Sequence, residues 1–264
     1  MRASALIVSS LCWLRAIAAD PSPAVVCDVR VISPHVADVS SLAAWRASTI
    51  TPEMSPQQQA EAVFATVVGF VHHEWYVREW LGGPEACVHD PIKTFNVYGY
   101  GHCCCTAAHV AALARSLGMP ARGCSTPGHT LAEVSYDGAW HMLDPAFIDY
   151  FPRADGVIAS VDELTAGISA WLAGHPEMAD PEAQRRFMRG GGWRSGPAIL
   201  THGRFLDDNG WLPERGHGWY SMLRQFGDPA QVRVYENGTT VGYRVDNRLR
   251  HGERLILQIG RAHV

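Results

Sequence analysis

The residue best suited to chemistry in this sequence is Cys103. It begins a predicted helix, Cys103 to about Leu117, which small residues favour and Gly118 ends. Helix N-termini carry partial positive charge and unpaired N–H groups, and both lower the pKa of a thiol there. The same N–H groups can hold an oxyanion. We therefore expect Cys103 to be a primed nucleophile, with Cys104 and Cys105 turned about 100° and 200° further round the helix.

A base and an acid follow in a predicted hairpin. Two β-type runs, Thr130 to Tyr136 and Ala139 to Asp144, flank Asp137-Gly138, a dipeptide that strongly favours a two-residue turn. Such a turn places His129 and Asp144 on one face as diagonal neighbours, about 7–8 Å apart at the backbone and within side-chain reach. The sequence therefore predicts a nucleophile, its base and the group that orients the base.

The same register gives expectations for the neighbours of this triad. Trp140 and Met142 share the face of His129 and are predicted to wall a dry pocket. Glu133 lies opposite Met142 and is expected to be structural rather than an acid catalyst. Free cysteines usually pack as small hydrophobes, and we expect this of Cys104 and Cys105.

Three ordered motifs carry a family resemblance. The first motif has the form Gly-x-Cys-x-x-x-Ala at Gly101–Ala107 and continues through the helix to Leu-Gly-Met-Pro-Ala-Arg at Leu117–Arg122. His129–Val134 has the form His-x-x-x-Glu-Val, and Trp140–Pro145 the form Trp-x-x-x-Asp-Pro. One such motif alone is weak, but three in order are specific. From about Ser55 to Tyr150 the chain resembles the transglutaminase-like superfamily of papain-related cysteine enzymes.

The resemblance implies an α+β fold whose papain-like, transglutaminase-like core packs a central helix bearing Cys103 on an antiparallel sheet. It implies that Cys103 is the nucleophile, His129 the base and Asp144 the orienting acid, with no cofactor and no metal ion. The implied substrate is a peptide or protein amide, with hydrolysis favoured over crosslinking to an amine. Leu131 departs from the family, which often has tryptophan there, and this alters the expected acyl pocket. The side-chain oxyanion donor has three candidates: Tyr100, Tyr98 and Asn96.

Two other classes of function stay open. One is a non-catalytic module that keeps the fold and holds a peptide or glycan in its cleft. The other is a metal or redox site at the triple cysteine, with ligands drawn from Cys87, His89, His102, Cys103, Cys104, Cys105, His109 and Cys124. Zinc is the less favoured of these interpretations, because no usual C-x₂₋₄-C … H-x₃₋₅-H layout occurs.

Several elements must surround the site. Ser55-Pro56 caps a predicted helix from Gln57 to about Leu81, with His72 and His73 near its end. Further elements are a strand over Val25–Val31, helices over Val161–Leu172 and Pro181–Met188, a glycine joint at Gly190–Gly192, turns over Arg194–Gly218, and a second hairpin, Val232–Glu236 and Thr239–Val245, around Asn237-Gly238.

The domain organisation follows from these elements. We expect an export signal over residues 1–19, since Arg2 precedes an apolar run and a small-residue cleavage pattern. Next we expect a transglutaminase-like domain over 20–190. After it, residues 191–258 are expected to form a linker and the start of a β-rich C-terminal extension that is truncated. Residues 259–264 read like sequencing-adapter DNA translated in frame, so we expect the native chain to diverge after Gln258.

Composition excludes several function classes. The chain has 264 residues, 47% of them hydrophobic and 18% charged, which excludes an intrinsically disordered protein. A net charge of −4 gives no basic field for nucleic acid. No apolar run reaches the roughly 18–20 residues of a membrane span. We expect an exported protein, periplasmic or extracellular, and the sequence indicates no oligomeric state.

Overall fold

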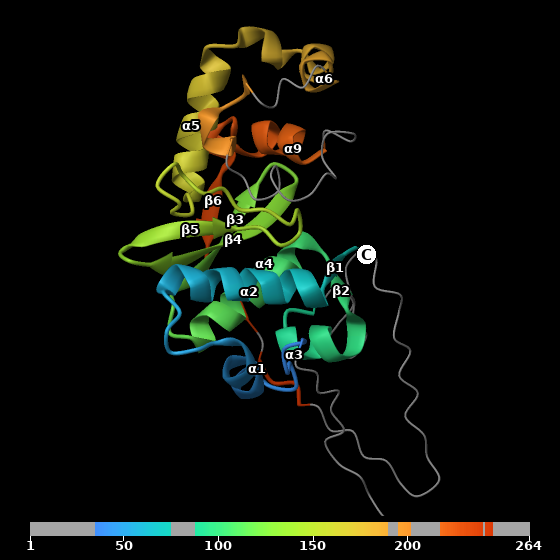
Figure 1. Cartoon of the computed structure of the whole chain (residues 1–264). Helices are drawn as coiled ribbons and strands as arrows, with labels where there is room; N and C mark the ends of the chain where they lie inside the picture. Colours follow the sequence, from blue (N-terminus) through green and yellow to red (C-terminus); the bar gives the residue numbers. More distant parts are fainter. Residues whose placement is uncertain (1–34, 75–87, 190–194, 202–216, 240, 245–264) are drawn as a thin grey trace, which may run out of the picture. The chain divides into compact units, whose positions relative to one another are not determined.

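The computed structural model describes residues 35–74, 88–189, 195–201, 217–239 and 241–244 (Figure 1). All of them belong to one compact unit, Arg30–Val245. The predicted export signal, the strand over Val25–Val31, the glycine joint at 190–192 and residues 259–264 lie outside the described residues. The described fold is mixed α+β with an antiparallel sheet, so the coarse fold class is confirmed.

Two capped helices open the fold. Helix α1 spans Leu42–Thr49 and helix α2 spans Pro56–Phe70. Ser55 caps α2 as predicted, in a capping box with Gln58. The predicted extension of this helix to Leu81 is wrong, because α2 ends at Phe70 and the chain turns into strand β1, His72–His73.

A short parallel pairing leads to the central helix. Helix α3, Pro91–Lys93, is followed by a π-helical turn over Thr94–Tyr98 and by strand β2, Tyr100–Gly101, which pairs with β1. Helix α4 then runs over Cys103–Ser116, as predicted. Its many alanines let it lie close to α2, and the two helices pack against each other (Figure 1).

The main sheet has the order β5-β4-β3-β6 with antiparallel pairing throughout. Its strands are β3, Ala121–Thr126, β4, His129–Tyr136, β5, Ala139–Leu143, and β6, Arg233–Tyr235. The predicted register of the β4–β5 hairpin is confirmed, with Tyr136 paired to Ala139. Asp137 and Gly138 have φ of 49° and 78°, as a type I′ turn requires.

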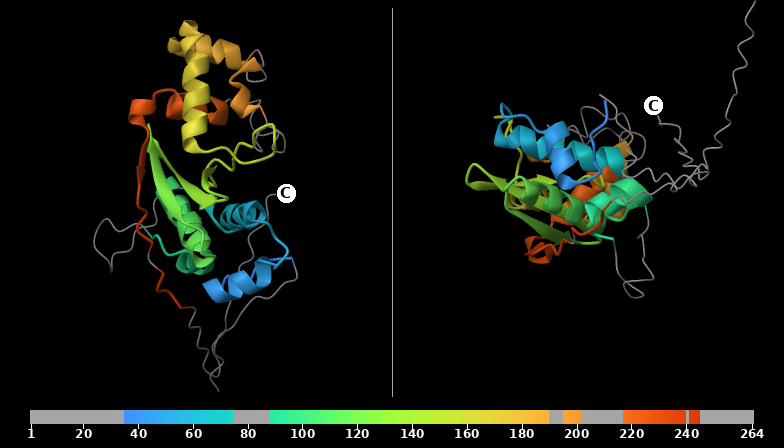
Figure 2. Two further views of the ribbon diagram at one scale, coloured as in Figure 1. Left: turned by 90° about the vertical axis from the view of Figure 1, so that its left-hand side faces the viewer. Right: turned by 90° about the horizontal axis from the view of Figure 1, so that it is seen from below.

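The remaining described elements are mostly helical. They are helix α5, Val161–Ala173, helix α6, Pro181–Arg189, helix α9, His217–Phe226, and 3₁₀ turns at Pro176–Ala179, Ala198–Leu200 and Pro229–Gln231. Helix α5 packs against α9 (Figure 2). One apolar core lies among α2, α4 and the sheet, and a second lies among the sheet, α5 and α9.

The prediction of a second hairpin around Asn237-Gly238 is wrong. Strand β6 instead joins the edge of the main sheet beside β3, and residues 241–244 form no strand. The backbone N–H groups of Gly242 and Tyr243 donate to the Asp90 carboxylate at 2.7 and 2.8 Å. A tertiary contact, and not a local turn, therefore holds this segment in place. The domain boundary at residue 190 stays a prediction.

Among the helices of the described residues, none has the length and apolar character needed to span a membrane.

Candidate active site

Cys103 lies at the start of α4, as predicted. His102 is the N-cap residue in extended conformation (φ −84°, ψ 172°), and its side chain makes no capping hydrogen bond. The first N–H groups of the helix are therefore not satisfied by a cap from that residue, which keeps the positive end of the helix available to the sulfur. The Cys103 side chain is buried, with 5% of the residue exposed.

His129 and Asp144 come together in the way the hairpin register predicts. His129 begins β4, Asp144 follows β5, and Nε2 of His129 lies 2.6 Å from Oδ2 of Asp144. Both residues are buried. The other carboxylate oxygen, Oδ1, accepts the N–H groups of Ala146 and Phe147 at 3.1 and 3.3 Å. These contacts fix the carboxylate, which in turn fixes the imidazole and leaves Nδ1 for the thiol.

The electrostatics of the site favour a thiolate–imidazolium pair. Burial raises the pKa of the Cys103 thiol, but hydrogen bonding to His129 and His73 and the charge of His129 outweigh it and bring the pKa to about 7. Burial lowers the pKa of His129, while the charge and hydrogen bond of Asp144 outweigh it and raise the pKa to about 10. Between these values a negative sulfur faces a positive imidazole.

Two further histidines lie beside the sulfur: His102, which the sequence offered only as a candidate metal ligand, and His73, which it placed near the end of a helix. Nδ1 of His102 is 3.2 Å from the Cys103 sulfur. His73 reaches the same sulfur because β1 pairs in parallel with β2, which places His73 beside Gly101. Burial and the charge of His129 lower the pKa of His102, so His102 stays neutral more readily than His129.

The oxyanion candidates can now be compared. The Asn96 side chain donates to the carbonyls of Val39 and Ile92 at 2.8 and 2.7 Å, so its amide is already engaged. Tyr98 and Tyr100 face each other edge to face, with ring centroids 6.4 Å apart. Of the three predicted candidates, Asn96 is therefore the least suited to receive a developing negative charge.

Glu133 is structural, as expected from the sequence. Its carboxylate is fully buried and forms an ion pair with Arg122, with 2.6 Å between Nη2 and Oε2. Its other oxygen accepts the N–H of Val161 at 2.7 Å, at the start of α5. The two motif residues Arg122 and Glu133 thus connect the sheet to α5.

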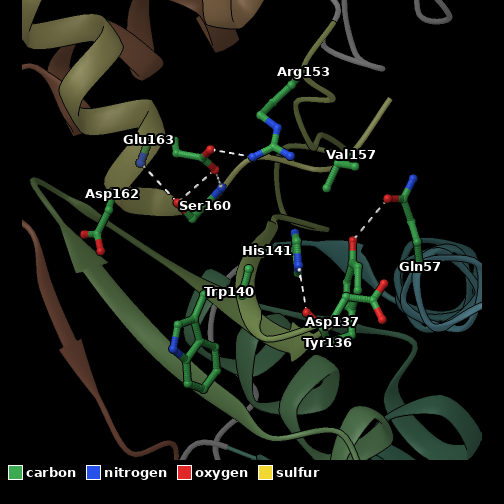
Figure 3. Close-up of a pocket in the computed structure, with 11 residues that line it drawn as sticks. Gln57, Tyr136, Asp137, Trp140, His141, Arg153, Val157, Ser160, Asp162 and Glu163 are labelled. Carbon is green, nitrogen blue, oxygen red and sulfur yellow. Dashed lines mark hydrogen bonds and ion pairs between the residues drawn. The ribbon is translucent and has the colours of Figure 1, made fainter. Parts of the chain in front are cut away.

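The prediction that Trp140 and Met142 wall a pocket at the triad is wrong. Met142 is fully buried in the second core with Leu131. Trp140 stacks against the Arg122 guanidinium at 4.1 Å and lines a pocket of about 410 Å³ near the hairpin turn. Figure 3 shows Arg153 and Glu163 facing each other in this pocket, which includes no triad residue. Trp140 and Met142 do share a face of the sheet with His129. The twist of the strands nevertheless brings each of them against residues other than the triad.

The other cysteines differ from Cys103. In the described part of the chain, Cys103, Cys104, Cys105 and Cys124 are all free thiols. Hydrogen bonding to Cys105 and burial raise the pKa of Cys104, and burial raises that of Cys124. Neither is activated as a nucleophile.

Two clusters among the described residues have ligand atoms close enough to share a metal ion. One consists of His73, His102 and Cys103, and the other of His89, Cys104 and Cys105.

Comparisons with protein-family models, with curated proteins and with solved structures find no match for this chain. What the site can do is therefore inferred from its own residues.

Proposed function

We propose that this protein is a transglutaminase-like cysteine hydrolase that cleaves peptide or protein amides through Cys103, His129 and Asp144. The observation that carries the proposal is the buried contact of 2.6 Å between His129 and Asp144. In the same site burial raises the pKa of Cys103, but hydrogen bonding to His129 and His73 and the charge of His129 outweigh it and bring the pKa to about 7. A nucleophile, a base and a group that orients the base have these mutual relations in thiol acyl transfer.

The proposed reaction begins when the Cys103 thiolate attacks the carbonyl carbon of an amide. The tetrahedral oxyanion collapses, the C–N bond breaks, and the His129 imidazolium donates its proton to the leaving amine. A thioester on Cys103 remains. Water then attacks the thioester while His129 accepts its proton, and the carboxylic acid and the Cys103 thiolate are released. An amine that replaces water in this second step would give a crosslink instead.

The backbone N–H of Cys103 is the proposed oxyanion donor, because it lies in the first turn of α4, where helical N–H groups have no intrahelical partner. The placement of α4 against β3 and β4 supports the proposal of a papain-like, transglutaminase-like core, with the nucleophile on a central helix beside an antiparallel sheet. The resemblance of the sequence motifs supports the same class. Export from the cell is proposed on the sequence alone.

The experiment uses a panel of peptide amides that release a fluorescent amine, with intact-mass measurement of the protein. We expect amine release and an acyl adduct on Cys103, both lost in Cys103→Ser. Incorporation of a fluorescent primary amine into the acyl product separates crosslinking from hydrolysis. Cys124→Ser is the matched control, since Cys124 is also a buried free thiol. Tight peptide binding without turnover or adduct would contradict the proposed enzyme and favour a non-catalytic binding module.

A further inference from the structure

A second cysteine–histidine cluster lies outside the proposed triad. Its members are His89, which directly precedes the N-cap of α3, and Cys104 and Cys105 in the first turn of α4. One ligand atom of each residue lies within 4.8 Å of the other two. We propose that these three residues bind one thiophilic metal ion, with Zn²⁺ as the expected occupant.

The spacing of the two sulfurs fits a shared metal ion. Two thiolates bound to one tetrahedral zinc at about 2.3 Å each lie about 3.8 Å apart. The sulfurs of Cys104 and Cys105 are 4.0 Å apart. Two sulfurs and an imidazole are a donor set that zinc prefers, and three protein ligands leave a fourth position for water or another ligand.

His89 provides an independent observation. Its Nε2 atom is buried and has no hydrogen-bond partner of ordinary geometry among the described residues, while the His89 imidazole lies close enough to the Cys104 sulfur to interact with it. Buried polar atoms are nearly always partnered, so this nitrogen calls for an explanation. Coordination to the metal ion supplies the missing partner. His89 and Cys104 are only half-buried, which gives an ion a route from solvent to the site.

The proposed metal site and the triad use different sulfurs. The Cys103 sulfur is contacted by the imidazoles of His102 and His129, in a separate cluster. Cys103 is turned about 200° from Cys105 round the helix and belongs to a different cluster, with His73 and His102, so an ion on Cys104 and Cys105 leaves the Cys103 sulfur unbound. The metal site therefore goes beyond the proposed function and stands whether or not Cys103 is a nucleophile.

The experiment titrates the reduced, metal-stripped full chain with Co²⁺, a spectroscopic substitute for Zn²⁺. We expect one Co²⁺ per chain with sulfur-to-cobalt charge transfer and tetrahedral ligand-field bands, both removed by one equivalent of Zn²⁺. Cys105→Ser should reduce the charge-transfer band by about half or abolish binding. Cys103→Ser and Cys124→Ser, each checked by circular dichroism, should leave the spectrum unchanged.

Two results of this titration would overturn the proposal. The first is the absence of a thiolate–cobalt band. The second is a band that Cys103→Ser removes and Cys105→Ser retains, because the ion then lies at His73, His102 and Cys103.

A measurement on the unsubstituted chain avoids variants that fail to fold. Each cysteine is alkylated with N-ethylmaleimide at pH 8, with and without one equivalent of Zn²⁺, and followed by peptide mass spectrometry. We expect Zn²⁺ to slow the modification of Cys104 at least tenfold and to leave Cys103 reactive. Equal modification of Cys104 in both samples, or protection of Cys103 alone, would contradict the proposed site.

Discussion

At the residue scale, Cys103 is contacted by more than one imidazole, and the proposed mechanism assigns the role of base to His129. The distinction comes from Asp144, which holds His129 at 2.6 Å and raises its pKa. Nδ1 of His102 also lies close to the sulfur, at 3.2 Å, but the pKa of His102 is lowered by burial and by the charge of His129. Proximity to the sulfur alone therefore does not distinguish the two histidines, and the contact with the buried Asp144 carboxylate favours His129 as the proposed base.

The first prediction compares these two imidazoles. We expect His129→Ala to slow iodoacetamide alkylation of Cys103 at pH 6 by about tenfold or more, because the thiolate loses its cationic partner. His102→Ala is the matched control and should change the rate by less than about threefold, since its neutral ring contributes little charge. The rates are measured by peptide mass spectrometry. Equal losses in both variants would contradict the assignment of the base.

The second residue-scale prediction concerns Asp149, which is fully buried and pairs its backbone with Asp144. Neither of its carboxylate oxygens has a hydrogen-bond partner among the described residues. Burial and the charge of Asp144 raise its pKa well above the usual range. Above the unfolded pKa of about 3.9, the folded state holds a proton that the unfolded state releases, so stability falls as pH rises.

Asp149→Asn removes this titration. We expect the variant to gain stability relative to the unsubstituted protein as pH rises from 4 to 7, by about 1.4 kcal/mol for each unit of the pKa shift. Urea unfolding at pH 4, 5.5 and 7 measures the difference. A stability difference that is constant with pH, or that grows toward acid, would show that Asp149 does not titrate in this way.

The contact between His129 and Asp144 could be predicted from sequence because its geometry is local. His129 and Asp144 are fifteen residues apart on one hairpin, and the Asp137-Gly138 turn fixes their register. His73 could not be assigned in the same way, since it reaches Cys103 through the pairing of β1 with β2, far apart in sequence. The apolar residues before it continue the helical period and so predict a longer helix, whereas α2 ends at Phe70 and His73 lies in β1.

Among the elements, the β4–β5 hairpin positions His129 and Asp144, the proposed base and acid, so the proposed site depends on its turn. Gly138 has φ of 78°, a conformation that costs an alanine about 1–2 kcal/mol. Gly69, exposed in helix α2, has open space where a Cβ would be added. The two glycines therefore respond to the same substitution in opposite directions.

We predict that Gly138→Ala lowers the free energy of unfolding by about 1–2 kcal/mol. Gly69→Ala, its matched control, should raise the free energy of unfolding by up to about 1 kcal/mol, because alanine loses less entropy in a helix. Urea denaturation measures both. A change of the same sign in the two variants would contradict the turn geometry.

Elements with strong local patterns were predictable, and those that depend on distant contacts were not. Helix α4 has a run of small residues followed by Gly118, helix α5 has apolar periodicity, and both were predicted nearly to their ends. Helix α9 was missed because it begins within a stretch of turn-forming residues. Asn237-Gly238 has the residue types of a hairpin turn, but Asn237 is buried against the molecule and its carbonyl accepts from Arg115 at 2.8 Å.

At the scale of the whole molecule, the described end of the chain returns to the first half. Strand β6 pairs with β3, Arg115 of α4 donates to Asn237, and Asp90 accepts from Gly242 and Tyr243. Asp90 itself is 5% exposed. These contacts join segments more than a hundred residues apart. Hydrophobic periodicity and turn-forming residues predict only local structure, so the sequence did not indicate them.

We expect Asp90→Ala to release the segment at Gly242 and Tyr243, because the two N–H groups lose their acceptor. Hydrogen exchange of the peptide covering 241–244 should accelerate by about tenfold or more. Asp228→Ala is the control, since Asp228 caps only its own turn, accepting from Ala230 at 3.0 Å. Unchanged exchange in Asp90→Ala would show that this contact does not hold the segment.

The proposed function requires that Cys103 be an activated thiolate in an assembled triad. The most direct measurement is alkylation of the folded, unsubstituted protein by iodoacetamide from pH 5 to 9, with each cysteine followed by peptide mass spectrometry. Cys103 should react selectively, with half-maximal reactivity near pH 7, while Cys104 and Cys124 lag because their pKa values are raised. Equal reactivity of all cysteines, with the profile of a free thiol near pH 8.5, would contradict the triad.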